Sequence, residues 1–149
     1  LKQADIIIYS AGTQHSSLYP TYMASGLTSA IADNRSAYKV FVTNIGADYE
    51  TPSYMASDYL HGAYRYLTIS GAYPRGLGEL VNSVLINQSH RKADESYVIY
   101  DEKGFGELPV QRFIGDYESL ESPGKHDGSK LIDAILNQYE NLSISGQPC

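Results

Sequence analysis

DIIIYSAGTQHSS, residues 5 to 17, is the stretch that decides the fold. Its first half contains an apolar run, Ile6-Ile-Ile-Tyr9, without the polar alternation of a strand that is exposed on one face. Continuous apolar runs are typical of strands buried on both faces, as in parallel sheets. Its second half, Ser10 to Ser17, holds small and hydroxyl-bearing residues, which suit a turn at a strand end. The stretch therefore predicts a buried strand that runs into an open loop.

Further runs of β-branched and apolar residues follow, separated by segments with helical periodicity. The additional predicted strands are Val40–Val42, Val84–Ile86, Tyr97–Tyr100 and Val110–Ile114. The predicted helices cover Leu27–Asn34, Leu60–Leu67 after a cap at Ser57, and Leu131–Leu142 after a cap at Asp127 or Ser129. This alternation predicts one α/β domain over residues 1–142, with right-handed crossovers and a mostly parallel sheet of about five strands. Residues 143–149 are expected to form a tail.

The composition is that of a folded domain, and it narrows the classes of partner. The chain has 149 residues, of which 42% are hydrophobic and 19% charged, as in globular proteins. The net charge is −6 and the basic residues are scattered, whereas binding of duplex nucleic acid favours a basic patch. No apolar run is long enough to span a membrane, and the single cysteine, Cys149, excludes a disulfide within the chain. We expect a cytoplasmic protein that binds neither nucleic acid nor membranes.

The loop after the first strand is the first candidate site. Ligands of open α/β sheets bind outside the carboxyl ends of the strands. Small residues such as Gly12 let backbone N–H groups face an anion, and Thr13, Ser16 and Ser17 add hydroxyl donors. Hydroxyl-rich turns also serve as helix caps, and the spacing alone favours neither role. A serine nucleophile activated by His15 is disfavoured, because neighbouring residues in a turn rarely face each other and no GxSxG elbow surrounds them.

The second candidate site follows the strand at Val40–Val42. Asn44 leaves that strand's carboxyl end and can read a base or ribose edge, so the two strand ends would form one crevice. Three carboxylates lie downstream, at Asp48, Glu50 and Asp58. They can bind a divalent cation or move a proton, but solvation and capping explain them better, since a carboxylate at a helix start complements the dipole.

The remaining polar residues carry weaker signals. His61, His90 and His126 do not follow a metal-ligand spacing, so the sequence predicts no protein-built metal site. Lone arginines such as Arg65 and Arg75 are more often solvated than bound to phosphate.

Together these segments resemble the 2-phospho-L-lactate transferase (CofD-like) family, whose members carry a strand followed by a GPGSxxTSxxPN loop. The corresponding stretch here reads SAGTQHSSLYPT, in which three residues match and two exchange one hydroxyl for another: Gly12, Ser17 and Pro20, then Thr13 and Ser16. The family's second signature, NxMTQxGET followed by a DH-containing helix, resembles NIGADYET here. Asn44, Glu50, Thr51 and Asp58 match, while Gly46–Asp48 replaces the MTQ core and Tyr59 replaces the His.

The resemblance implies a Rossmann-like three-layer domain whose serine-rich loop and Asn44 contribute to a nucleotide or phosphoester site. It also implies that this chain, which starts at Leu1 and enters a strand almost at once, is the carboxyl-terminal half of a larger domain, with the amino-terminal half as its partner. The expected site residues are Gly12, Thr13, Ser16, Ser17 and Asn44. A homo-oligomer is compatible with the sequence.

Two functions follow from this resemblance. The first is transfer of a phosphorus-containing group from a nucleoside diphospho donor, with Mg²⁺ neutralising the diphosphate. The second is the role of the bacterial gluconeogenesis-factor relatives, which resemble nucleotide-sugar sensors rather than catalysts. The altered MTQ and DH segments count against the first activity, and no catalytic residue is assigned. A domain that keeps the fold without the site is the third reading.

Overall fold

The computed structural model describes residues 1–69, 75–89 and 96–145, and within them the chain forms an α/β domain. Its strands are β1 (Ile6–Tyr9), β2 (Tyr38–Val42), β3 (Ser83–Asn87) and β4 (Gln111–Gly115). The helical elements are η1 (Gln14–Leu18), α1 (Tyr19–Tyr22), α2 (Leu27–Asp33), α3 (Ala56–Ile69), α4 (Leu77–Leu80), α5 (Glu102–Phe105) and α6 (Gly128–Ser145).

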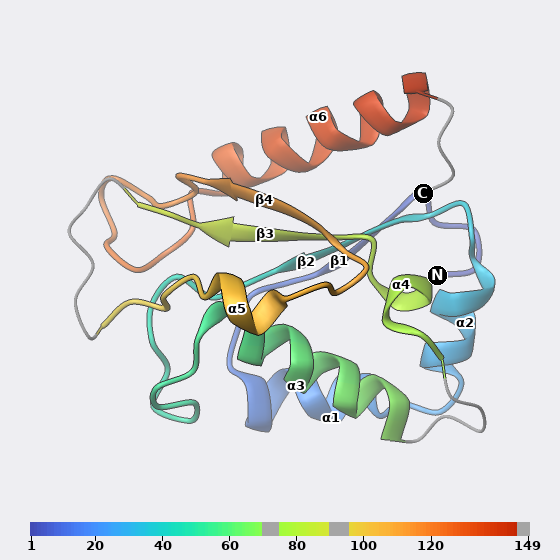
Figure 1. The fold of residues 1–149 in the computed structure, drawn as a ribbon, viewed down its shortest axis with the longest axis horizontal. Helices are drawn as coiled ribbons and strands as arrows, with labels where there is room; N and C mark the ends of the chain where they lie inside the picture. The colour runs from blue at the N-terminus through green and yellow to red at the C-terminus, as the bar shows by residue number, and fades with distance from the viewer. Residues whose placement is uncertain (70–74, 90–95, 146–149) are drawn as a thin grey trace.

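The four strands form a wholly parallel sheet in the order β1-β2-β3-β4. When consecutive parallel strands lie side by side, right-handed crossovers place their connections on one face. The helices between β1 and β4 accordingly cover one face, and among the described elements α6 covers the other (Figure 1). The loops that follow the strands gather at the carboxyl edge of the sheet. The predicted three-layer α/β fold is confirmed.

One predicted strand, Tyr97–Tyr100, is wrong, so the sheet of the described residues has four strands. Tyr97 forms only an isolated antiparallel bridge with Gly46. Its neighbours bond the loop after β2, through Val98 N to Ile45 O at 2.8 Å and Ala47 N to Ser96 O at 2.7 Å. The segment therefore crosses the carboxyl edge of the sheet instead of joining it.

The helix ends differ from expectation in two places. Asp127 caps α6 as predicted, since its Oδ1 accepts the N–H groups of Ser129 at 2.9 Å and Lys130 at 3.1 Å. Ser57 instead lies within the first turn of α3, where its N–H donates to Asp101 Oδ1 at 3.0 Å. The last helix continues to Ser145, past the expected start of the tail at residue 143, and residues 146–149 lie outside the described ranges.

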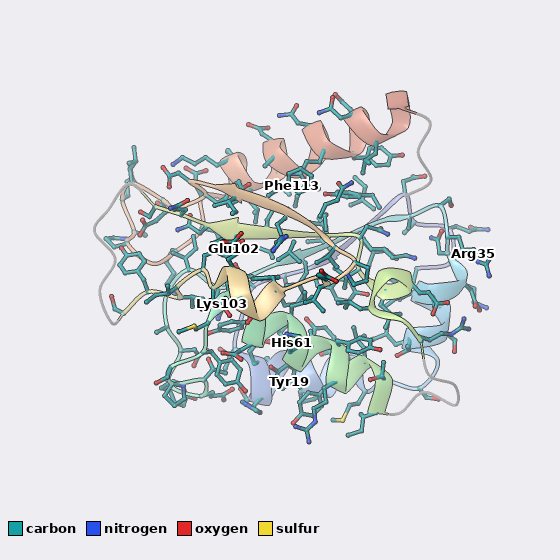
Figure 2. All side chains as sticks on the ribbon, viewed as in Figure 1. Tyr19, Arg35, His61, Glu102, Lys103 and Phe113 are labelled. Atoms are coloured by element: carbon teal, nitrogen blue, oxygen red, sulfur yellow. The ribbon has the colours of Figure 1, made fainter. Side chains whose placement is uncertain are left out.

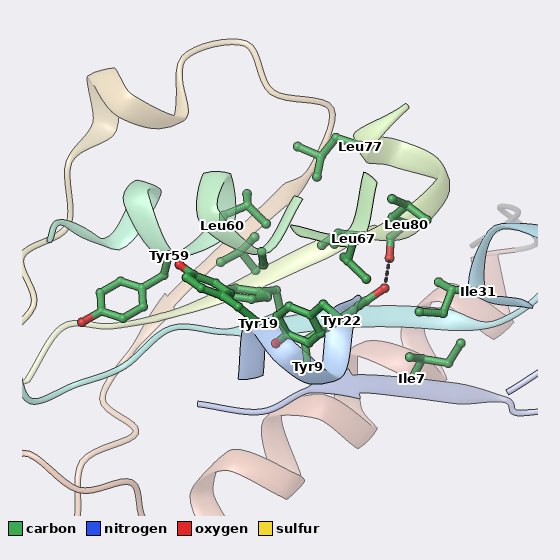
Figure 3. Packing of buried hydrophobic residues seen from close by; sticks show 14 of the residues in the cluster. Ile7, Tyr9, Tyr19, Tyr22, Ile31, Tyr59, Leu60, Leu67, Leu77 and Leu80 are labelled. Carbon is green, nitrogen blue, oxygen red and sulfur yellow. Dashed lines mark hydrogen bonds between the residues drawn. The ribbon is translucent and has the colours of Figure 1, made fainter. Parts of the chain in front are cut away.

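The main core lies between the sheet and α3, and it is rich in tyrosine (Figure 3). Helix α3 buries residues at helical spacing, among them Tyr59, Leu60, Ala63 and Leu67. Tyr9 reaches across this core to donate its hydroxyl to Leu80 O at 2.8 Å. A second, smaller core on the other face packs α6 against the sheet.

The burial of each strand reflects its position in the sheet. All five residues of β2 are buried, as the unbroken apolar run predicts for a central strand. In β1 the side chain of Ile8 is 45% exposed, because among the described strands β1 is an edge strand. On the opposite edge, Phe113 of β4 packs toward α6 (Figure 2).

The closest packing in the main core predicts one sensitive glycine. A Cβ atom at Gly62 of α3 would lie 2.0 Å from Tyr19 Oη and 2.8 Å from Tyr19 Cζ. Tyr19 has no room to retreat, because it is 2% exposed and its ring stacks on Tyr66 at 4.2 Å between centroids. We expect Gly62→Ala to lower the free energy of unfolding by about 1–3 kcal/mol despite the higher helix propensity of alanine, as urea denaturation would measure. Gly128→Ala is the matched control, since a Cβ there meets nothing within 4 Å. Equal stability of the Gly62 variant and the wild type would contradict this packing.

Candidate functional site

A cleft of about 730 Å³ opens at the carboxyl edge of the sheet. Four segments line it: the loop after β1, the loop after β2, the segment before α5 and the loop that leads into α6. The lining residues are Ala11–Thr13, Asn44–Tyr49, Ser96, Tyr97 and Pro123–His126. The cleft therefore lies where parallel α/β sheets place their ligands.

Asn44 joins the first two loops through both backbone groups of Gly12. Asn44 Oδ1 accepts the Gly12 N–H at 2.9 Å, and Asn44 Nδ2 donates to Gly12 O at 3.1 Å. Gln14 Nε2 donates to the same carbonyl at 2.8 Å. Because a side-chain amide both donates and accepts, it can bond the two groups at once, and Asn44 fixes the entrance of the loop rather than pointing to a base.

Glu50 makes a second connection between the same loops. Its Oε2 accepts the N–H groups of His15 at 3.0 Å and Ser16 at 3.1 Å. Hydrogen bonds from the Ser16 side chain and from the Ser16 and His15 backbones hold the pKa of Glu50 below its usual range. Asp48 Oδ1 accepts the Glu50 N–H at 3.0 Å and braces the turn between the two connections. Three N–H groups of the loop that was expected to hold a phosphate, those of Gly12, His15 and Ser16, thus have acceptors within the protein.

The third wall is held by a buried carboxylate. Glu118 is 2% exposed, and its Oε1 accepts the Tyr97 hydroxyl and the Gly124 N–H, each at 2.7 Å. Ser89 donates to its other oxygen. Gly124 O in turn accepts the Gly46 N–H at 3.1 Å. Glu118 therefore anchors the loop before α6 against the loop after β2.

Lys125, Asp48 and His126 are the residues of the cleft lining whose side chains are most readily charged near neutral pH. Burial lowers the pKa of His126 from its usual 6.5, although a hydrogen bond to the Thr43 backbone opposes that shift. The imidazole is therefore mostly neutral at pH 7, and Lys125 supplies the positive charge of the lining.

The structure brings some of the predicted site residues together and separates others. Gly12, Thr13 and Asn44 line the cleft, whereas Ser16 and Ser17 are exposed and do not. Ser17 instead accepts the Thr21 hydroxyl on its carbonyl at 3.0 Å.

The predicted carboxylates divide in the same way. Asp48 lines the cleft, Glu50 lies beside it, and Asp58 accepts the Met55 N–H at 2.8 Å at the start of α3, as a helix cap. Arg75 forms ion pairs with Asp33 and Glu79 at 3.3 Å. His90 lies outside the described ranges.

Sequence reasoning missed the contribution of Lys125, Gly124 and Tyr97. Tyr97 and Gly124 are placed by bonds to Glu118 and Gly46, and Lys125 follows Gly124 in the same loop, an arrangement that no local pattern shows. The signal present in the sequence was a turn, Gly124-Lys-His-Asp127, directly before the strongest helical pattern.

Within the described residues, no group of three or more His, Cys, Asp or Glu is arranged to hold a metal ion. Nor is any described helix long and apolar enough to cross a membrane.

Comparison with curated proteins finds similar sequences under one name. The chain is 28% identical over 159 residues to a gluconeogenesis factor of Halalkalibacterium halodurans, covering 99% of this chain and 46% of that protein. It is 26% identical over 149 residues to a gluconeogenesis factor of Listeria monocytogenes, covering 95% of this chain and 43% of that protein. The chain thus spans less than half the length of these relatives. No protein-family model matches it.

Solved structures share the fold. Two crystal structures of protein BH3568 from Bacillus halodurans superpose with TM-scores of 0.73 and 0.72, at 26% and 25% identity. Each match covers 91% of this chain and 44% or 43% of the other. One of these structures is described as a member of the UPF0052 family. The Rossmann-like arrangement is therefore shared with proteins that extend beyond the matched region.

The reciprocal bonds of Asn44 predict a specific sensitivity. Asn44→Ala removes the acceptor of Gly12 N and one donor to Gly12 O, so we expect the free energy of unfolding to fall by about 1–3 kcal/mol. The Gly12 amide should also exchange its hydrogen faster, which amide exchange followed by NMR would measure. Asn137→Ala, on the exposed surface of α6, is the matched control. Unchanged exchange at Gly12 would show that Asn44 does not hold the loop.

Proposed function

We propose that the cleft binds the phosphate-bearing part of a nucleotide-linked small molecule, and that the parent protein senses this ligand as a regulator. The observation that carries the proposal is the position of Lys125 and Thr13 in one cleft at the carboxyl edge of a parallel sheet. A lysine ammonium and a threonine hydroxyl are both donors suited to phosphate oxygens. The name gluconeogenesis factor, carried by both relatives, supports a regulatory role.

The mode of phosphate binding that we propose relies on side chains. Three backbone donors along the cleft are already used, by Asn44 at Gly12, by Gly124 at Gly46 and by Ser96 at Ala47. The Lys125 ammonium and the Thr13 hydroxyl then provide the phosphate contacts. Neutral His126 adds no positive charge, so the affinity for a diphosphate depends mainly on Lys125.

Two tyrosines at the cleft suit a nucleobase. Tyr49 is 87% exposed and lies in the lining with Tyr97. A large exposed aromatic ring beside a phosphate-binding cleft favours stacking of a base, which has a π-face of its own. We propose that the base lies on Tyr49 while the diphosphate points toward Lys125.

Mg²⁺ would bind here mainly through the ligand. Asp48 is the one carboxylate of the cleft lining, and one of its oxygens already accepts the Glu50 N–H. One carboxylate together with substrate phosphates is a common way for proteins to hold Mg²⁺. The donor set therefore fits a metal that arrives with a nucleoside diphosphate compound, and in that case the ion would neutralise phosphate charge.

The second candidate function is a transferase of phosphorus-containing groups, and the presence of both Asp48 and neutral His126 in one lining favours it. A carboxylate and a neutral imidazole can each accept a proton from an attacking hydroxyl. In either function, the rest of the parent protein would contribute the remainder of the site.

Titration of the full-length protein tests the proposal. We expect uridine or guanosine diphospho compounds to raise the melting temperature by mass action, and Lys125→Ala to weaken that binding by about tenfold. Lys103→Ala is the matched control, because Lys103 lies on α5 outside the cleft lining (Figure 2). Binding of a uridine diphospho-sugar without turnover supports the regulator, and release of a nucleotide product supports the transferase. Equal affinities of the Lys125 variant and the wild type would contradict the proposed site.

A further inference from the structure

The floor of the cleft is a turn that is attached to the neighbouring loop at both of its ends. Asn44 bonds Gly12 at one end, and Glu50 bonds His15 and Ser16 at the other. The five residues between Asn44 and Glu50, residues 45–49, all line the cleft. The shape of this lining therefore depends on both attachments.

The Glu50 attachment lies outside the cleft itself. Neither Glu50 nor the two residues that it bonds, His15 and Ser16, belongs to the lining. Because the carboxylate and both N–H groups lie outside the lining, Glu50 does not fill the cleft. This position is expected of a residue that holds the loop, rather than of one that competes with the ligand for the cleft.

The hydrogen bonds of Glu50 to His15 and Ser16, here called the fastening, tie the loop after β2 to the loop after β1. Both N–H groups bond the same oxygen, Oε2, which makes one atom the hub of the connection. The hydrogen bonds from Ser16 and His15 lower the pKa of Glu50, so the carboxylate is ionised at neutral pH and accepts them as charge-assisted bonds. The Glu50 N–H also bonds Asp48, a residue of the lining, at 3.0 Å, which links the fastening directly to the cleft.

We propose that Glu50 is a positioning residue for the cleft's ligand, and that its bonds to His15 and Ser16 hold residues 45–49 in the shape that the ligand requires. This inference rests on the proposed function, since it concerns the same cleft. Without the fastening, the turn would populate other conformations, and the apparent affinity would fall with the fraction of molecules that keep the binding shape.

Three variants of the full-length protein test this role. Glu50→Ala removes the acceptor, and we expect about tenfold weaker binding of a uridine diphospho-sugar. The unfolding midpoint should fall only slightly, because both bonds lie at the exposed surface. Glu50→Gln keeps one carbonyl oxygen able to accept both N–H groups, so it should restore most of the affinity. Glu107→Ala, an exposed carboxylate outside the cleft, is the control and should bind as the wild type does.

A ligand-free measurement separates this inference from the proposed function. Without ligand, amide hydrogen exchange at His15 and Ser16 should accelerate in Glu50→Ala but not in Glu107→Ala. Unchanged exchange at both amides would overturn the fastening whether or not the wild type binds a ligand. If the wild type binds none of the probes, the proposed function fails, and the exchange rates still decide whether Glu50 holds the loop. Tighter binding by Glu50→Ala would identify Glu50 as a competitor of the ligand and overturn its positioning role.

Discussion

The cleft depends on one pair of hydrogen bonds, between the side-chain amide of Asn44 and the two backbone groups of Gly12. Parallel strands pair along their length, but their loops diverge beyond the carboxyl ends and have no ladder to hold them. A carboxamide is suited to this place because it can satisfy a backbone donor and a backbone acceptor together. This pair of hydrogen bonds holds the loops after β1 and β2 side by side. The second connection at Glu50 then encloses the turn that lines the cleft.

The sheet and its tyrosine-rich core provide a firm base for these loops. Strand β2, which leads into Asn44, is buried along its whole length between the two helical layers. Burial raises the pKa of Tyr22 to about 12, so this core tyrosine remains neutral at physiological pH. The third loop approaches from the other side of the sheet edge, where Glu118 holds it by bonds to Tyr97 and Gly124. The loops of the cleft are therefore held by three side chains: Asn44, which belongs to the lining, and Glu50 and Glu118, which lie outside it.

Much of the fold could be predicted from local pattern, because burial on both faces leaves an unbroken apolar run. β1 was predicted with its observed bounds, and the strands β2, β3 and β4 were found with ends shifted by one or two residues. Tyr97–Tyr100 has the same apolar character, yet it crosses the sheet edge, since its partners are the loop residues Ile45 and Ala47. Local composition does not distinguish these two environments.

The candidate site could be predicted only in part. The placement of Gly12, Thr13 and Asn44 along one cleft could be predicted, because the carboxyl ends of neighbouring parallel strands meet at one edge. Ser16 and Ser17 have the same chemistry as Thr13, but the chain turns into η1 there and carries them out of the cleft. The position of Lys125 depends on its neighbour Gly124, which bonds Glu118 and, across the cleft, Gly46, and no spacing in the sequence indicates these bonds.

The most direct measurement of the account's central claim is an amide NMR titration of the full-length protein with a uridine diphospho-sugar. The account predicts chemical-shift changes concentrated at residues 11–13, 44–49 and 123–126, which line the cleft. It also predicts little change on the outer surface of α6. Saturable binding whose shift changes fall elsewhere, with these three loops unaffected, would contradict it.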